Sequence, residues 1–444
     1  METQKDIYKT SRFLYIVEAA LEYFIALMMI GAYLAKLTEA IGISDAVTGI
    51  LSAFVSLGFG FQVVALFLAN KRPVKRWVTV LHSLNQLFFA LAYLVPFLSF
   101  TRTQKTVIFV VLLLLGYIFS NVVNAPKINW YMDLVDDRKR GSFTATKEMV
   151  SLIGGMIFSL SMGLVIDNFE AAGNIKGAFI VCGVSIFVLM LLHSATLIFS
   201  KEKPCEVTEK VSTKQMIGDL LKDKKLFKVI LVGVLWNIAH YACTSFYGTY
   251  QTKELGFTMT FVSILGAMYA IVRSIFSRPL GKFADKHSFV NMLNICFIIA
   301  MVGFAVNVFT IPSNGKIFFT AYYALYAIAM AGINSATINL IYDYVDKEKR
   351  IGALAINCTL SGFAGFFTTL CVSPLVEYIQ ENGNVFFGIS MYAQQLVSLI
   401  SVVLMVGLLV YLNLVVKKLK NVRDTNDGQI DDIEEKGKVD YEEI

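Results

Sequence analysis

Charged residues are scarce in this chain, at 16% of its 444 residues, whereas a soluble globular protein carries about a quarter. Histidine occurs only four times, and the six cysteines are scattered without a CxxC pair. The spacing expected of a metal centre is therefore missing, and we interpret the cysteines as small buried side chains. A Walker-type lysine motif is also missing, which argues against ATP hydrolysis. We expect no enzyme activity, no cofactor and no metal.

Apolar residues are abundant instead, at 56% of the chain. Runs of about 20 apolar residues recur, and each is long enough to cross about 30 Å of hydrocarbon. Residues 107–116 do not alternate between polar and apolar side chains as a strand of a membrane barrel does. The pattern predicts twelve spans, at 13–36, 46–69, 77–98, 106–126, 143–166, 177–199, 227–249, 259–280, 289–311, 317–341, 353–376 and 386–416.

These spans indicate an all-α membrane protein, with twelve transmembrane helices in two pseudo-symmetric six-helix bundles. The first span carries Glu18 and Glu22 and precedes further spans, so we expect it to be retained rather than cleaved as a signal peptide. The expected parts are an N-terminal bundle at 1–200, a cytoplasmic linker at 201–225, a C-terminal bundle at 226–416 and an acidic disordered tail at 417–444.

Lysine and arginine fall mainly on one side of the predicted membrane. With both termini in the cytoplasm, 31 of the 39 lie in inner segments and only 6 in outer loops. This asymmetry follows the positive-inside rule and predicts a multi-pass protein of the inner, cytoplasmic membrane. The net charge of +6 then reflects topology, and we expect the lipid bilayer as a partner but no nucleic acid.

The chain repeats itself at an offset of 210 residues. The segment 132–140 aligns with 342–350, and five positions in it are identical: Asp133, Val135, Asp136, Lys139 and Arg140 match Asp343, Val345, Asp346, Lys349 and Arg350. The repeat indicates a duplication of six spans, and an even number of spans keeps both copies in the same orientation.

Small residues spaced four apart mark one face of four spans. The stripes are Ser52, Ser56 and Gly60; Gly155, Ser159 and Gly163; Gly266, Ala270 and Ser274; and Gly365, Thr369 and Ser373. Such stripes let helix backbones approach closely in lipid. They indicate either a seam between the two halves or packing within each half.

Two acids in the first span are the most informative candidates for a functional site. Glu18 and Glu22 lie four residues apart on one helix face, and Glu22 lies roughly 13 Å into the span. An ionised carboxylate at that depth is costly, so each acid should face a cavity or a partner. Glu22 is a candidate for proton or cation coupling or for substrate binding, and the alternative is a structural ion pair.

Amides and aromatic rings occur on three other spans. The candidates are Asn121, Asn124 and Lys127 in the fourth span; Trp236, Asn237, His240 and Tyr241 in the seventh; and Asn334 and Asn339 in the tenth. Amides bind hydroxyl groups and rings cover C–H faces, a combination that suits a sugar or polyol. The alternative is hydrogen bonding between helices. We interpret His82, in the third span, as a packing residue.

Loop sequences resemble those of the major facilitator superfamily, across nearly the whole chain. The GxxxDR/K motif that this family carries between spans 8 and 9 is present as Gly281, Asp285 and Lys286, whereas the copy between spans 2 and 3 is degenerate around Asn70 and Lys71. The family's Arg-Gly loop is present at Arg140, and Arg350 is its repeat partner.

The resemblance implies that spans 1, 4, 7 and 10 line a cavity and that spans 2, 5, 8 and 11 form the seam. It also implies two bundles that rock about a central site. Spans 5 and 8 would then meet on the cytoplasmic side, which makes Glu148 and Arg273 candidates for a gating or structural ion pair.

We therefore expect a monomeric secondary transporter that imports a small polar solute, with a sugar or glycoside favoured and protons or Na⁺ as the coupling ion. One rival is a drug or metabolite exporter, which would need a more apolar cavity. A second rival is a membrane receptor or scaffold that carries no flux.

Overall fold

The computed structural model describes residues 7–69, 73–136, 139–204, 213–345 and 349–419. The acidic tail beyond 419, Cys205, Asn70 and Lys71 lie outside these ranges. The first part of the chain forms α1 (Lys9–Leu27), α2 (Gly31–Ile41), α3 (Asp45–Ser52), α4 (Phe54–Gly60), α5 (Gln62–Ala69), α6 (Lys75–Ala92), η1 (Val95–Phe97), α7 (Arg102–Met132), α8 (Arg140–Ala171) and α9 (Ile175–Phe199).

The second part begins with the surface helix α10 (Thr213–Lys222). It continues with α11 (Lys224–Tyr241), η3 (Thr244–Phe246), α12 (Tyr247–Thr249), η4 (Tyr250–Glu254), α13 (Met259–His287), α14 (Phe289–Val308), α15 (Gly315–Tyr342), α16 (Arg350–Glu381), β1 (Val385–Phe386), β2 (Ile389–Ser390), α17 (Ala393–Leu414) and η6 (Val416–Lys418). The two strands form one short antiparallel hairpin between α16 and α17.

The predicted all-α membrane architecture is confirmed. Ten helices of the described chain are long and apolar enough to cross a membrane, and the bent pair α1 and α2 makes eleven. The remaining predicted span corresponds to α6, which packs against α7 and α9 but carries the buried polar residues His82, Asn85 and Gln86. These residues lower its hydropathy, so α6 is not among the helices apolar enough to span by composition, although it packs beside two that are.

The first span is broken near its middle, which the hydropathy pattern did not indicate. Helix α1 ends at Leu27, α2 begins at Gly31, and their axes differ by 51°. Gly31 has φ +55°, a left-handed conformation that a residue with a side chain rarely adopts. The break points α1, which carries Glu18 and Glu22, and α2 in different directions.

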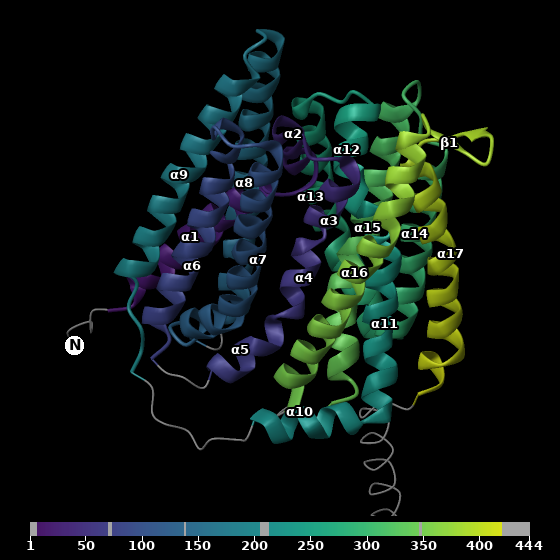
Figure 1. Ribbon diagram of the computed structural model, residues 1–444. Helices are drawn as coiled ribbons and strands as arrows, with labels where there is room; N and C mark the ends of the chain where they lie inside the picture. The colour runs from purple at the N-terminus through teal and green to yellow at the C-terminus, as the bar shows by residue number, and fades with distance from the viewer. Residues whose placement is uncertain (1–6, 70–72, 137–138, 205–212, 346–348, 420–444) are drawn as a thin grey trace, which may run out of the picture.

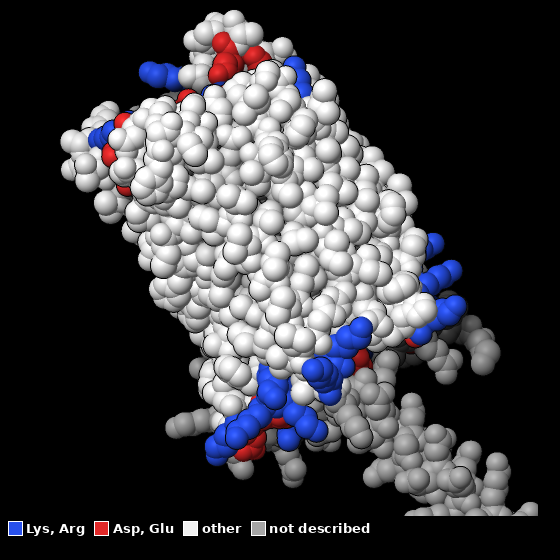
Figure 2. All heavy atoms as spheres, turned by 90° about the vertical axis from the view of Figure 1, so that its right-hand side faces the viewer, with Lys and Arg blue, Asp and Glu red and all other residues white. Residues whose placement is uncertain are grey.

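The two halves stand side by side as helical bundles, and α10 lies along one end of the molecule (Figure 1). We call this end the α10 face and the opposite end the distal face. A broad uncharged belt separates the two ends, and Lys and Arg side chains gather at the end that carries α10 (Figure 2). The belt is the surface expected to contact lipid hydrocarbon.

Helix boundaries repeat with the same offset as the sequence motif. Helices α8 and α16 each contain 32 residues and begin 210 positions apart. At their first residues, Arg140 Nε donates to the carbonyl oxygen of Met132 at 3.3 Å, and Arg350 Nη2 donates to that of Tyr342 at 3.3 Å. The repeated arginines therefore close equivalent turns at the ends of α7 and α15.

The small-residue stripes account for much of the contact between the halves. The Ser56 hydroxyl on α4 donates to the Gly362 carbonyl oxygen on α16 at 2.9 Å. A Cβ atom at Gly362 would lie 2.5 Å from the backbone carbonyl oxygen of Ser56. A Cβ atom at Gly163 on α8 would lie 2.9 Å from the Met259 carbonyl oxygen on α13. Gly155 instead abuts Tyr23 of its own half, so the stripes serve both purposes.

Candidate functional site

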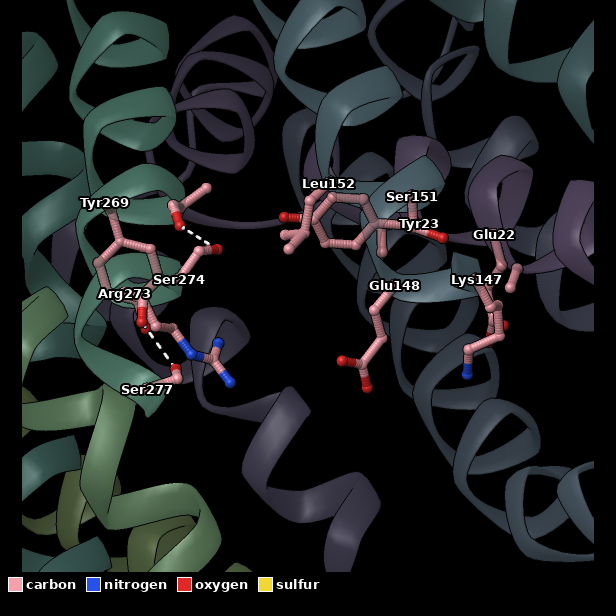
Figure 3. Close-up of a pocket in the computed structure, with 13 residues that line it drawn as sticks. Glu22, Tyr23, Lys147, Glu148, Ser151, Leu152, Tyr269, Arg273, Ser274 and Ser277 are labelled. Carbon is pink, nitrogen blue, oxygen red and sulfur yellow. Dashed lines mark hydrogen bonds between the residues drawn. The ribbon is translucent and has the colours of Figure 1, made fainter. Parts of the chain in front are cut away.

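A cavity of about 520 Å³ separates the halves between α1 and α8 on one wall and α13 on the other. It lies nearer the α10 face, because its residues on α8 come from the start of that helix (Figure 3). The residues that line it are Ala19, Glu22, Tyr23, Ala26, Lys147, Glu148, Ser151, Leu152, Tyr269, Ala270, Arg273, Ser274 and Ser277.

The distal side of the same seam is closed by polar contacts. Near the end of α8, Asp167 accepts hydrogen bonds from the backbone N–H groups of Met259 and Thr260 at 2.7 Å each. These donors are the first N–H groups of α13, and a carboxylate is favoured there by the helix dipole. Asp167 therefore fastens α8 of one half to α13 of the other.

A second acid closes the other distal seam. Asp45, at the start of α3, pairs with Lys253 and accepts from Gln380 Nε2 at 3.0 Å. Deeper in the protein, Tyr33 contacts Ser263 at 2.9 Å. At the seam between α8 and α13, the halves are thus joined on the distal side and separated by the cavity on the α10 side.

Glu22 connects the cavity to a buried group of charges in the N-terminal half. Its side chain is 25% exposed, whereas those of Lys127 and Glu18 are 3% and 0% exposed. Lys127 Nζ lies 2.5 Å from Glu22 Oε2 and 2.9 Å from Glu18 Oε1. A single ammonium on α7 therefore bridges the two carboxylates that the sequence placed on one face of the first span.

Two histidines complete this group. His82 Nε2, on α6, lies 3.1 Å from Glu18 Oε1 and 2.9 Å from Lys127 Nζ. His193 Nε2, on α9, lies 3.1 Å from the same Glu18 oxygen. Both imidazoles have no exposed surface. We call Glu18, Glu22, His82, Lys127 and His193 the charge cluster.

The charge cluster contains a donor set that could hold a metal ion by distance alone. Ligand atoms of Glu18, His82 and His193 all lie within 4.8 Å of one another, and imidazole with carboxylate suits zinc. Lys127 Nζ, however, lies against both the Glu18 oxygen and the His82 nitrogen. Because this ammonium already neutralises the shared carboxylate, we interpret the group as an ion-pair cluster and not as a metal centre.

Most predicted amides bind their own helix rather than a common site. The side-chain N–H groups of Asn121, Asn237 and Asn339 donate to backbone carbonyl oxygens four residues earlier, each at 2.9 Å. Asn124 is half-buried and Asn334 is exposed, and neither lines the cavity. Their expected role in solute binding stays a prediction for another conformation.

The aromatic candidates on α11 form a cluster inside the C-terminal half. Trp236 stacks on Phe297 with ring centroids 5.4 Å apart. The ring of His240 approaches the Tyr326 hydroxyl at 3.2 Å. Tyr241 lies against Gly365, where a Cβ atom would be 2.6 Å from its ring. These contacts place the three predicted residues among packing partners on α14, α15 and α16.

Glu148 and Arg273 stand on opposite walls of the cavity, on α8 and α13 (Figure 3). No ion pair joins them among the contacts of the described residues. Of the loop residues, Asp285 and Lys286 are exposed, and nothing lies within 4 Å of a Cβ atom at Gly281. The predicted gating contacts therefore remain predictions for a conformation in which the α10 side is closed.

Several residues of the site were not predicted from the sequence. His193 lies in a strongly apolar helix, and no pattern linked it to Glu18, 175 positions away. Tyr23 and Tyr269 face the cavity from the two halves, as do Ser151, Ser274 and Ser277 (Figure 3). Their spacing alone resembles ordinary helix packing, although an unpaired histidine in an apolar run signals a polar partner.

The sequence profile of the Major Facilitator Superfamily matches residues 19–369, and a second match covers residues 250–429. The chain belongs to this superfamily. It is therefore a membrane transporter rather than an enzyme. A comparison with curated proteins gave no significant match.

Solved structures of other superfamily transporters share this fold. A variant of the nucleoside transporter NupG has a TM-score of 0.71 at 15% identity, over 90% of this chain and 98% of that one. A D-xylose-proton symporter has a TM-score of 0.67 at 15% identity, with 90% and 97% covered. The POT family transporter PepTSo has a TM-score of 0.64 at 13% identity, with 90% and 97% covered.

Proposed function

We propose that this superfamily member is a proton-coupled transporter that imports a small polar solute, with a sugar or glycoside favoured. The observation that carries the proposal is Glu22. This carboxylate lines the cavity between the halves and is held by the buried Lys127, which also binds Glu18. A titratable group that contacts both the solute compartment and a buried ion pair can link proton binding to solute binding.

The link operates through the partners of Lys127. When Glu22 is ionised, it holds the ammonium at the cavity wall, and protonation removes that attraction because only the ionised carboxylate binds a cation strongly. Lys127 then rests on Glu18 alone. Since α1 and α7 carry these groups, a change in their pairing changes how two cavity-side helices of the same half pack.

The cavity walls favour a hydroxylated solute over an apolar one. Tyr23 and Tyr269 offer aromatic faces from the two halves, and three serine hydroxyls accompany them together with Arg273 (Figure 3). Rings cover the C–H faces of a sugar while hydroxyl and guanidinium groups bind its oxygens. Two similar folds belong to a nucleoside transporter and a D-xylose-proton symporter, which supports this substrate class.

We assign the α10 face to the cytoplasm because lysine and arginine concentrate there (Figure 2). The cavity then faces the cytoplasm, and the contacts of Asp167 and Asp45 close the outer side. Cysteines introduced at Arg102 and Lys222 in a cysteine-free variant test the assignment. An impermeant reagent added to intact cells should label the first position and not the second, and the reverse pattern would contradict it.

Flux into proteoliposomes tests the proposed function directly. We expect an inward proton gradient to drive accumulation of D-xylose or uridine, and dissipation of the gradient by a protonophore to abolish it. Alanylalanine serves as the control of a different solute class. Solute binding without counterflow would favour a receptor. Uptake that needs an outward proton gradient would favour the exporter.

A further inference from the structure

The charge cluster as a whole has an unbalanced charge. With both imidazoles neutral, the carboxylates of Glu18 and Glu22 outnumber the ammonium of Lys127 by one. A net charge in a low-dielectric interior is costly. One more positive charge, as a proton or a monovalent cation, would neutralise the group.

The donor set favours a proton over Na⁺. Na⁺ is a hard cation that needs several oxygen ligands, whereas the cluster offers only the carboxylate oxygens of Glu18 and Glu22, and Lys127 already binds one oxygen of each. The other candidate atoms are imidazole nitrogens, which bind protons readily near neutral pH. The cluster is therefore suited to a single additional proton.

His82 is better placed than His193 to accept that proton. Its Nε2 atom faces two carboxylates, Glu18 Oε1 at 3.1 Å and Glu22 Oε1 at 3.5 Å. His193 Nε2 faces only Glu18 Oε1, to which it can donate in its neutral form. The two rings meet edge to face with centroids 4.5 Å apart. His193 is accordingly a positioning residue that orients Glu18.

We propose that His82 is the proton-binding residue of this transporter and that it takes up one proton through Glu22 in each cycle. This inference rests on the proposed function, which it deepens by naming the residue that binds the coupling proton. It differs from the sequence-based interpretation of His82 as a packing residue.

The proton transfer is balanced within the cluster. A proton from the cavity binds the Glu22 carboxylate and then passes to His82 Nε2, which gives an imidazolium and restores the carboxylate. The charge of the cluster changes from −1 to 0. His82 and Lys127, whose nitrogens lie 2.9 Å apart, would then both be positive, so Lys127 must move away. Because Lys127 also binds Glu22 at the cavity wall, movement of Lys127 changes the position of a carboxylate that faces the solute.

Four other titratable or charged groups surround the site. Tyr15 on α1 and Tyr131 on α7 stack on each other with centroids 4.2 Å apart. Lys147 on α8 lies 5.3 Å from the Tyr15 ring centroid. Glu148 follows it on the cavity wall. None of these contacts involves His82, so the carboxylates and Lys127 decide its protonation.

Nitrogen-15 NMR of histidine-labelled protein in lipid tests the proposal without any solute. The chain has only four histidines, so the variants His193→Gln, His240→Gln and His287→Gln assign the His82 signal by elimination. We expect His82 to convert to an imidazolium as the pH falls through a range of about 8 to 5, while His193 stays neutral. Glutamine can still donate to Glu18, so His193→Gln should preserve the titration of His82.

A His82 signal that stays neutral throughout, or an imidazolium at His193 instead, would overturn the proposal. Transport in the same lipid separates the two claims. Proton-driven uptake with a neutral His82 would contradict the proton site at His82 but agree with the proposed function. A titrating His82 without proton-driven uptake would contradict the proposed function but agree with a proton site at His82. In the uptake assay, His82→Gln should abolish accumulation, and the exposed His287→Gln should not.

Discussion

Lys127 is the residue on which the charge cluster depends. Its ammonium contacts both glutamates and His82 from a position that is 3% exposed. A charge is tolerated at such depth only when it is paired, because desolvation costs several kcal/mol per ion. Removal of this one cation leaves the buried Glu18 and the partly exposed Glu22 without their shared partner.

Lys127→Met should therefore destabilise the protein by about 3–5 kcal/mol, the usual cost of removing one partner from a buried ion pair. Chemical unfolding of purified protein in detergent measures the change. Lys36→Met is the matched control, because the Glu170 partner of Lys36 is 48% exposed and an exposed pair contributes under about 1 kcal/mol. Equal effects of the two substitutions would contradict the structural role of Lys127.

Among the helices, α4 packs against α16 with their backbones in close contact. The Ser56 hydroxyl donates to the Gly362 carbonyl oxygen, and a Cβ atom at Gly362 would lie 2.6 Å from the Gly60 nitrogen. The clash is with backbone, which cannot turn away as a side chain can. This seam must therefore be rebuilt if Gly362 gains a side chain.

We expect Gly362→Ala to cost about 1–3 kcal/mol, as overpacking does, and to slow transport. Gly407→Ala on α17 is the control, since nothing lies within 4 Å of a Cβ atom there. Thermal unfolding and flux are measured on the same preparations. Native stability and flux in Gly362→Ala protein would show that the close contact at this seam is unimportant.

The end of α8 supplies the closure on the distal side. Asp167 bonds two N–H groups of α13 across the halves, whereas Glu170, one turn further, pairs with Lys36 of its own half. The two acids are close in sequence but only Asp167 joins the halves. Substitution of each acid in turn therefore tests whether the contact between the halves keeps the distal side closed.

Asp167→Ala should shift the protein towards an outward-open conformation, because α13 loses two charge-assisted hydrogen bonds. A cysteine at the buried Ser263, in a background without native cysteines, should then react faster with an impermeant reagent from outside. Glu170→Ala should leave its rate unchanged. If Asp167→Ala also left the rate unchanged, Asp167 would not be part of the closure.

At the scale of the whole molecule, hydropathy and the internal repeat predicted the fold class, because the lengths of the apolar runs and the duplicated segments can be read from the sequence. They did not predict the break at Gly31 or the polar character of α6, where His82, Asn85 and Gln86 are buried among helices of one half. The helix faces that meet in three dimensions decide these features, and a single sequence does not specify them.

Only part of the site was predicted, because its residues come from helices whose contacts a single sequence does not specify. Glu18 and Glu22 share a face by helical periodicity alone, so their joint role could be foreseen. Their partners Lys127, His82 and His193 come from α7, α6 and α9. Only the packing of the bundle brings these helices to α1. The family arrangement named α7 as a cavity helix but placed α6 outside.

Uphill transport by Glu22→Gln protein tests the central claim most directly. Glutamine keeps the size and hydrogen bonding of Glu22 but cannot take up a proton near neutral pH. Gradient-driven uptake and equilibrium exchange are measured in the same liposomes, with Glu170→Gln as the control. We predict that Glu22→Gln loses accumulation and retains exchange, which needs no net proton movement. Accumulation of solute by Glu22→Gln protein under an imposed pH gradient would contradict coupling through Glu22.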